Sequence, residues 1–395
     1  MSDPKSYAIT AGHVFDGVTL HASAAVLVDR SRIVAVVPRS DLPAGIMIHD
    51  LPESAWLCPG FIDLQVNGGA DILFNDHPTP AGIFAITAAH RKFGTTAFLP
   101  TLISDTPAKM KAALEAVQAS IDAQPSVLGI HLEGPFISPG KAGIHDLRAI
   151  RPPSPEDERI LCLPRKGKIL VTLAPEEVPR GFVARLAQAG ISLSLGHSMA
   201  SYAQTRAAVA EGITGFTHLF NAMRPLTSRE PGPIAAALEL PDIWYGLIVD
   251  GAHVDPAMLR LALRGAGRPM LVTDAMPPVG GHRAAFMLGD REITVQSGRC
   301  VSAEGTLAGS VVDMATAVRN CVKLLDVPLT QALRFASAHP ASFIGVGHML
   351  GRLAPGYRAD IVAFEPDTLN VLATWVAGSR EGEPLDAGVA QFPAG

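Results

Sequence analysis

The sequence predicts an α/β protein: a (β/α)8 barrel of the TIM type, with a small all-β domain formed from both chain ends. Three observations lead to this prediction. The middle of the chain alternates short apolar runs with segments of helical periodicity, which is typical of a parallel sheet built from β/α units. Both ends instead show β-rich runs separated by turn residues. The length of 395 residues suits a barrel of about 250 residues plus an accessory domain.

The β-rich runs at the two ends define the expected small domain. Three strands are expected in the first part, at 7–10, 25–28 and 32–37. Two more are expected near the end, at 359–364 and 371–376. We therefore assign residues 1–57 and 350–395 to a small β-sandwich-like domain and residues 58–349 to the barrel.

Eight apolar runs between these ends are the expected barrel strands. They lie at 60–65, 96–99, 127–131, 169–173, 192–195, 215–218, 245–249 and 270–273. Expected helices lie at 107–123, 200–211, 256–264, 311–325 and 329–337. An insert at 280–309 follows the eighth strand. Eight repeats of strand and helix is the number that closes a barrel of this type.

Composition limits the classes of function. Charged residues make up 17% of the chain and mean hydropathy is +0.26, which favours a large buried core over disorder. The net charge of −5 gives no support for nucleic-acid binding. Four cysteines without CxxC spacing indicate a reduced, cytoplasmic setting. The start is unlike a signal sequence and no apolar run reaches about 18 residues, so no membrane association is expected.

Polar residues gather just past the carboxyl ends of several expected strands. Glu133, His197, His218 and Asp274 each follow a different apolar run. In a (β/α)8 barrel these ends converge on one mouth, where active sites lie. Each residue also has a purely structural interpretation, since a histidine can serve a local hydrogen bond and an aspartate can cap a helix. Their equivalent positions on different strands favour a shared site.

A glutamate with two histidines is a known catalytic Zn²⁺ set with open positions for water and substrate. The same ligand types suit Fe²⁺ or Mn²⁺. Asp274 would take a proton from water at the metal and pass it to a leaving nitrogen. Outside this pattern we expect six histidines to be ordinary loop or surface residues: His13, His21, His49, His77, His90 and His282. His339 and His348 have no assigned role.

The segment PGFIDLQVNG at 59–68 resembles the first-strand motif of the amidohydrolase superfamily. Most members have His-x-His there and hold two metals. The pair Gln65 and Asn67 is the form found in one branch of the N-acetylglucosamine-6-phosphate deacetylases. Further motifs of that branch follow in order: HLEGPF (131–136), GHS (196–198), THLFNAM (217–223), REPG (229–232), DGAHV (250–254), TDAM (273–276) and LAGS (307–310).

The resemblance implies one divalent metal per subunit, with Zn²⁺ favoured over Fe²⁺ or Mn²⁺. Its implied ligands are Glu133, His197 and His218. Gln65 and Asn67 replace the pair that would bind a second ion, and neutral amides are poorer ligands than imidazoles. Asp274 matches the general base and acid of the family. His145 resembles the histidine that polarises the acetyl carbonyl or orients the sugar.

The same resemblance implies how a sugar phosphate would be held. His253 is similar to a ligand of the sugar, and Asn221 and Ala222 would offer backbone N–H groups to the phosphate. Arg229 resembles an arginine that reaches the phosphate from a neighbouring subunit, which implies a homodimer. Leu307 belongs to a segment similar to a loop that closes over the sugar. Structural interpretations stay open: a surface ion pair for Arg229, a solvent-facing loop position for His145, and local hydrogen bonding for His253.

The activity implied is hydrolysis of the N-acetyl group of N-acetylglucosamine 6-phosphate, and three alternatives remain open. One is an amidohydrolase acting on another N-acyl or cyclic amide substrate, which the phosphate-binding residues disfavour. A second is a non-catalytic amidohydrolase-like scaffold, which the complete polar set disfavours. A third is an unrelated carbohydrate-binding barrel, but aromatic residues are only 6% of the chain. The sequence does not distinguish the glucosamine epimer from galactosamine or mannosamine.

Overall fold

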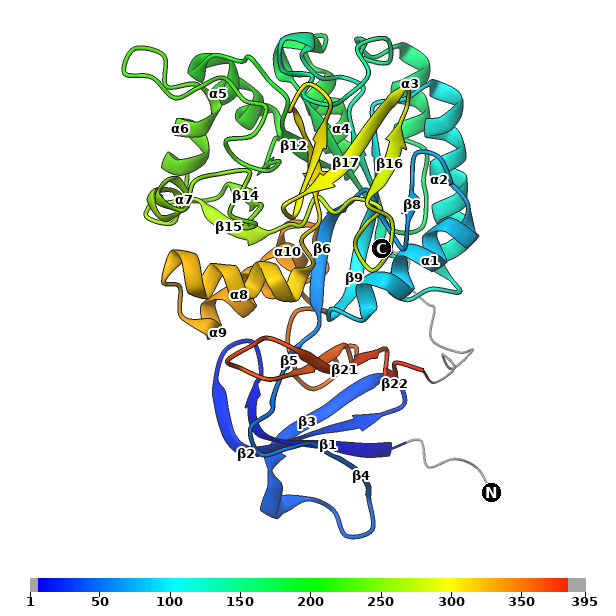
Figure 1. Cartoon of the computed structure of the whole chain (residues 1–395), viewed down its shortest axis with the longest axis vertical. Coiled ribbons are helices and arrows are strands. Elements are labelled where there is room, and N and C mark those ends of the chain that lie inside the picture. The colour runs from blue at the N-terminus through cyan, green and yellow to red at the C-terminus, as the bar shows by residue number, and fades with distance from the viewer. Residues whose placement is uncertain (1–5, 383–395) are drawn as a thin grey trace.

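The computed structural model describes residues 6–382. The ends of the expected small domain, 1–5 and 383–395, lie outside the described residues. Figure 1 shows the barrel with its helices in the upper part of the molecule and a β-rich layer below it. In that lower layer the first strands of the chain (blue) lie beside the last ones (red).

The barrel sheet confirms the (β/α)8 prediction. Its parallel strands, in spatial and chain order, are β6 (Phe61–Val66), β9 (Thr95–Ile103), β10 (Gly129–Glu133), β11 (Lys168–Leu173), β12 (Ser192–Leu195), β13 (Gly215–Phe216), β14 (Trp244–Leu247) and β15 (Arg268–Leu271). The ends of the sheet meet where the Asp274 N–H donates to the Gln65 carbonyl oxygen at 3.0 Å. All eight expected strands are present. β13 is shorter than expected because His218 turns the chain with a positive φ of 30°.

Helices follow most of the barrel strands, and three more come after β15 and the insert. They are α1 (Pro80–Arg91), α2 (Pro107–Ile121), α3 (Pro155–Leu161), α4 (Phe182–Gln188), α5 (Tyr202–Glu211), α6 (Gly232–Glu239), α7 (Pro256–Ala262), α8 (Met314–Leu325), α9 (Leu329–Phe335) and α10 (Ala338–Phe343). Short 3-10 turns lie at η1 (Arg39–Asp41), η2 (Pro139–Lys141) and η3 (Pro175–Glu177). Local sequence sets the helix starts: Thr106 caps α2 with Pro107 in the first turn. No helix within residues 6–382 is long and apolar enough to cross a membrane.

The two chain ends share one sheet of eight strands. They are β1 (Ser6–Phe15), β2 (Leu20–Asp29), β3 (Arg32–Pro38), β4 (Met47–Asp50), β5 (Trp56–Pro59), β20 (Ile361–Phe364), β21 (Val371–Val376) and β22 (Ser379–Arg380). β5 pairs with β1 on one side and antiparallel with β20 on the other, which joins the start of the chain to its end. Trp375 and Ile9 are buried together in the apolar cluster of this sheet. The small all-β domain expected from both ends is therefore confirmed as a fold, and its exact boundaries stay a prediction.

The expected insert forms a small antiparallel sheet of its own. Its strands are β16 (Ala285–Leu288), β17 (Arg291–Gln296), β18 (Arg299–Ser302) and β19 (Leu307–Ser310). Outside the insert, a separate small hairpin pairs the two-residue strands β7 (Gly68–Gly69) and β8 (Ile72–Leu73). The segment expected as a loop at Leu307 is thus the strand β19. The difference arises because this segment pairs with β18 on one side, while Ser310 exchanges backbone hydrogen bonds with Asp274 and Met276 on the other.

A buried ion pair connects the end sheet to the barrel, and we expect its loss to be costly. The Arg358 guanidinium binds both oxygens of Asp360, with Nε to Oδ1 at 2.8 Å, and Nη1 donates to the Pro125 carbonyl oxygen at 2.7 Å. Both side chains are at most 7% exposed. Replacing Arg358 with methionine leaves the Asp360 carboxylate buried without its cation. The free energy of unfolding should fall by about 3–5 kcal/mol, measured by chemical denaturation.

The matched control is an exposed pair of the same type. Arg159 and Glu156 lie 2.6 Å apart on α3, and both side chains are about 60% exposed. Arg159→Met should leave the free energy of unfolding almost unchanged in the same measurement, because water and salt screen such pairs. Equal effects of the two substitutions would contradict a structural role for the buried pair.

Candidate active site and metal centre

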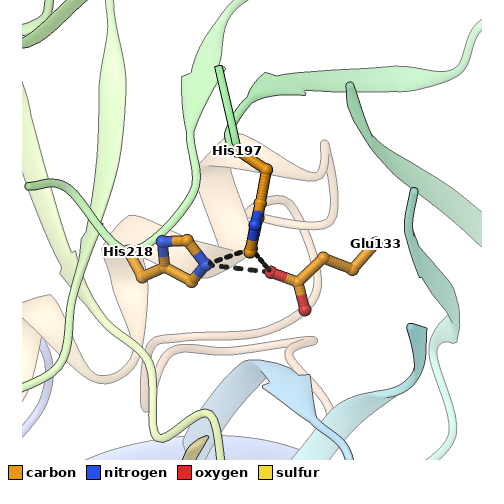
Figure 2. A group of neighbouring side chains, drawn as sticks. All are labelled: Glu133, His197 and His218. Carbon is orange, nitrogen blue, oxygen red and sulfur yellow. Dashed lines mark hydrogen bonds and ion pairs between the residues drawn. The ribbon is translucent and has the colours of Figure 1, made fainter. Parts of the chain in front are cut away.

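Three side chains from different strands meet at the mouth of the barrel. Glu133 ends β10, and His197 and His218 lie two residues beyond the ends of β12 and β13. The Glu133 Oε1 atom lies 2.9 Å from His218 Nε2 and 3.2 Å from His197 Nε2, and the two Nε2 atoms are 3.1 Å apart (Figure 2). All three residues are buried. The predicted convergence of these side chains is therefore present.

The hydrogen bonds around His197 indicate that a cation belongs between these atoms. His197 Nδ1 lies 2.8 Å from the Lys141 carbonyl oxygen, which can only accept, so Nδ1 carries a proton. In the neutral ring Nε2 then presents a lone pair to Glu133 Oε1, also an acceptor. Two lone pairs facing each other are unfavourable unless a positive ion lies between them. Ligand atoms around a tetrahedral Zn²⁺ with bonds of about 2.1 Å would be roughly 3.4 Å apart, a little more than the spacing here.

The charge state of the carboxylate also fits a cation site. Burial raises the pKa of Glu133, but the close contacts of its carboxylate with the imidazoles of His197 and His218 outweigh burial and hold the pKa well below its usual value. Burial lowers the pKa of His218, but the Glu133 carboxylate outweighs it and leaves the pKa above the usual value. The site is therefore an anionic carboxylate that draws positive charge toward it.

Asp274 lies beside this group and is held by the two amides of the first strand. Its Oδ1 accepts from Gln65 Nε2 at 3.0 Å and from Asn67 Nδ2 at 2.6 Å. Gln65 Nε2 also lies 3.1 Å from Glu133 Oε1. Within residues 6–382 the Asp274 Oδ2 atom has no hydrogen-bond partner, and Asp274 lines the central cavity. The amides that stand where a second metal pair would be thus orient a carboxylate with one free oxygen.

The environment of Asp274 suits proton transfer. Burial, followed by repulsion from Glu133, raises the pKa of Asp274 to about 6. A carboxyl group with a pKa near the working pH can both accept and return a proton. His197, His218 and Asp274 all have positive φ angles, at 48°, 30° and 52°. Such backbone strain costs about 1–3 kcal/mol per residue and clusters at functional sites.

His145 faces the same cavity as a neutral hydrogen-bond donor. The Ser104 N–H donates to His145 Nδ1 at 3.3 Å, so Nδ1 is the unprotonated nitrogen and Nε2 carries the hydrogen. Burial, and then the charge of His197, lowers the pKa of His145 to about 3. The His145 and His197 ring centroids are 4.5 Å apart. His145 can therefore donate from Nε2 to an acceptor bound beside the metal centre.

His253 is fixed by a carboxylate that the sequence analysis did not single out. His253 Nδ1 lies 2.7 Å from Asp250 Oδ2, while Asp250 Oδ1 accepts from the backbone N–H groups of Ala252 and His253. Burial raises the pKa of Asp250, but the hydrogen bond from His253 outweighs it and lowers the pKa. The spacing of aspartate and histidine within DGAHV was the signal for this pair, since three residues of a turn bring the side chains together.

These residues surround a cavity of about 230 Å³. All predicted site residues except Gln65 and Arg229 line it. The Asn221 N–H donates to the His218 carbonyl oxygen, whereas the Ala222 N–H has no hydrogen-bond partner within residues 6–382. Arg229 is exposed on the loop before α6 and does not reach the cavity of its own chain.

Two further residues near the site, besides Asp250, were not found from the sequence. Ser104 follows β9, one of the two strands to which no polar end residue was assigned, and its position after an apolar run was the available signal. His90 was expected in a loop or at the surface, and that expectation is wrong. It is fully buried in α1 and its Nε2 lies 2.9 Å from the Gly68 carbonyl oxygen. The apolar face of α1 carries it inward, under the loop that presents Asn67.

The family model that matches the chain agrees with this geometry. The model of the amidohydrolase family matches residues 56–387. The chain belongs to the amidohydrolase family. This assignment confirms the resemblance found in the motifs.

Curated relatives of this amidohydrolase match along most of their length. An N-acetylgalactosamine-6-phosphate deacetylase of Shewanella sp. (strain ANA-3) is 39% identical over 94% of this chain and 93% of its own. An N-acetylglucosamine-6-phosphate deacetylase of Haemophilus influenzae is 34% identical over 90% of this chain and 93% of its own.

Solved structures give the same match. The N-acetylglucosamine-6-phosphate deacetylase of Pasteurella multocida superposes with a TM-score of 0.92 at 34% identity, covering 95% of this chain and 99% of that one. A mutant of the Mycobacterium smegmatis deacetylase in complex with N-acetyl-D-glucosamine-6-phosphate gives a TM-score of 0.87 at 34% identity, with the same coverage.

Proposed function

We propose that this amidohydrolase removes the N-acetyl group of an N-acetylhexosamine 6-phosphate, with N-acetylglucosamine 6-phosphate as the substrate. The products are acetate and glucosamine 6-phosphate. The observation that carries the proposal is the cation site formed by Glu133, His197 and His218, next to a carboxylate with a free oxygen and a neutral histidine donor. That combination is what hydrolysis of an unactivated amide needs. The choice of a sugar phosphate as the substrate is based on the names of the relatives.

The ligand set favours one divalent ion per subunit, Zn²⁺ first, with Fe²⁺ or Mn²⁺ as alternatives. When bound, such an ion acidifies water and polarises the acetyl carbonyl. Asp274 Oδ2 accepts the proton of the attacking water, while its Oδ1 stays held by the amides of Gln65 and Asn67. The His145 Nε2–H donates to the acetyl oxygen as negative charge develops there.

Asp274 then completes the reaction as an acid. Collapse of the tetrahedral carbon breaks the C–N bond, and the proton held on Oδ2 moves to the departing nitrogen. The nitrogen therefore leaves as an amine and not as an amide anion. His253, fixed by Asp250, binds sugar hydroxyls, and the Ala222 N–H binds the phosphate. The phosphate lies away from the reacting carbon, so its role is to position the substrate.

A cytoplasmic homodimer belongs to the same proposal. Arg229 is exposed on the loop before α6, outside the cavity of its own chain. From that position it would reach the phosphate of a neighbouring subunit.

A second candidate substrate is N-acetylgalactosamine 6-phosphate. The relative from Shewanella, at 39% identity, carries that name. The two sugars differ in the orientation of one hydroxyl group. An acetate-release assay on both phosphates and on the two unphosphorylated sugars, after metal stripping and separate reconstitution, tests the proposal. Acetate release from none of them would reject it, and the better phosphate identifies the epimer.

The pH profile should show an acid limb set by Asp274. The ionised carboxylate is the active base, and its pKa is raised to about 6. As pH falls through that value the base is protonated, so kcat/KM should fall about tenfold per pH unit. A bound cation favours the ionised form and moves the limb to lower pH. An acid limb above pH 7 in the metal-loaded enzyme would contradict this role.

A further inference from the structure

The active-site cavity is lined by histidines and carboxylates but, in the described part of the chain, by no permanently charged cation. Among residues 6–382, no lysine or arginine lines it, while Glu133 and Asp274 contribute carboxylates. Under the proposed function, a phosphate with nearly two negative charges must be bound near this cavity. The cationic groups that hold it must therefore lie beyond the cavity lining.

A second hollow lies next to the active-site cavity and shares part of its wall. It has a volume of about 410 Å³, and Gly143, His145 and Ala222 line both spaces. Its other lining residues include Lys141 and Arg291 and, among residues 6–382, no aspartate or glutamate. Ala222 therefore lies at the junction, with an unpaired N–H, and two cations lie on the outer side of that junction.

The backbone holds Lys141 in place. Lys141 is the last residue of η2, and its N–H donates to the Ser138 carbonyl oxygen at 2.9 Å. Its own carbonyl oxygen accepts from His197 Nδ1 at 2.8 Å. The lysine is thus fixed to a residue of the metal centre through its main chain. Its side chain forms no hydrogen bond or ion pair within residues 6–382.

Arg291 belongs to the insert, and its side chain, like that of Lys141, has no bonding partner within residues 6–382. It begins β17 and pairs across the hairpin with Leu288. Its guanidinium is exposed and makes no hydrogen bond or ion pair in the described part of the chain. The neighbouring Arg148 differs, because it binds Asp146 and Asp290, both at 2.7 Å. Arg291 lowers the pKa of Asp146 only through its charge, after the direct bond from Arg148.

We propose that Lys141 and Arg291 of the same chain bind the 6-phosphate, together with the Ala222 N–H and in addition to Arg229 of the partner subunit, and so contribute to specificity for phosphorylated substrates. Charged donors at a phosphate form stronger hydrogen bonds than neutral ones, and arginine can bind two phosphate oxygens at once. Lys141 would act as a point charge next to the rigid loop. The function of the insert sheet would then be to place Arg291, at the start of β17, in the wall of the second hollow.

The test compares phosphorylated and unphosphorylated N-acetylglucosamine with the full-length, metal-loaded enzyme. Lys141→Gln and Arg291→Gln should each lower kcat/KM for the phosphorylated sugar by about tenfold, and the double variant by more, mainly through KM. Their kcat/KM for the unphosphorylated sugar should stay at the wild-type value. Lys109→Gln is the matched control: Lys109 is a cation at the same end of the barrel, paired with Asp105 and outside both cavities.

The outcomes separate this inference from the proposed function on which it rests. A wild-type enzyme that acts on both sugars equally would reject a phosphate substrate, and with it the phosphate subsite. A wild-type preference that survives unchanged in the double variant would overturn the role of Lys141 and Arg291 alone. A loss of equal size on both sugars would also overturn it, because it would indicate a structural effect on the loop that carries His145.

Discussion

Replacing Asp274 with asparagine should lower kcat by about 10³-fold or more while leaving the metal content unchanged. General acid–base groups contribute about 10²–10⁴-fold, and here one carboxylate serves as both base and acid. The substitution is nearly isosteric. The asparagine oxygen can still accept from Gln65 and Asn67, so only the proton-accepting Oδ2 is lost. Steady-state acetate release and metal analysis of the same sample measure both quantities.

Asp242→Asn provides the control for this substitution. Asp242 is 86% exposed and pairs with Arg268 on the surface, so the same chemical change there should leave kcat at the wild-type value. Full activity in Asp274→Asn would remove the carboxylate from the mechanism. A variant that lost its metal as well as its activity would place Asp274 among the ligands and not beside them.

The barrel could be predicted from the sequence because its signals are local. Each strand is a short apolar run buried on both faces, and caps such as Thr106 with Pro107 mark where a helix begins. The strands of the insert could not be predicted in this way. Its strands β16 to β19 are only four to six residues long and bury one or two residues each, and they are specified by pairing with one another. A strand that depends on a partner is hard to distinguish from a loop in one sequence.

The site could be predicted in part, for the same reason. Residues that directly follow a strand, such as Glu133, are placed by the topology of a barrel. Residues whose contribution depends on an inward rotation of a helix or loop were missed. His90 lies under Gly68 because α1 packs against that loop, and Lys141 lines the same hollow as Ala222 on a turn that is hydrogen-bonded to His197. Such contacts join parts of the chain that no local pattern connects.

Replacing Glu133 with glutamine should release the metal and abolish activity together. Glu133 is the only anion among the three clustered side chains, and its pKa lies well below the usual value because the two imidazoles lie against it. A neutral amide of the same shape cannot offset the charge of a divalent ion. We expect a fall of at least about 100-fold in metal affinity, since changing even an outer-shell partner costs 10–100-fold. Dialysis against a chelating buffer, followed by metal analysis, measures it.

The same measurement determines how many ions the enzyme holds, and the expected number follows from the positions of Gln65 and Asn67. Both donate amide hydrogens to Asp274, which is how groups behave when no second cation competes for that carboxylate. Wild type should therefore bind one equivalent per chain, and Glu133→Gln none. Glu177→Gln, which removes the same charge on the loop after β11, should keep its single equivalent. Two equivalents in the wild-type protein would mean that the amides move aside, and Asp274 would then be a ligand shared between ions.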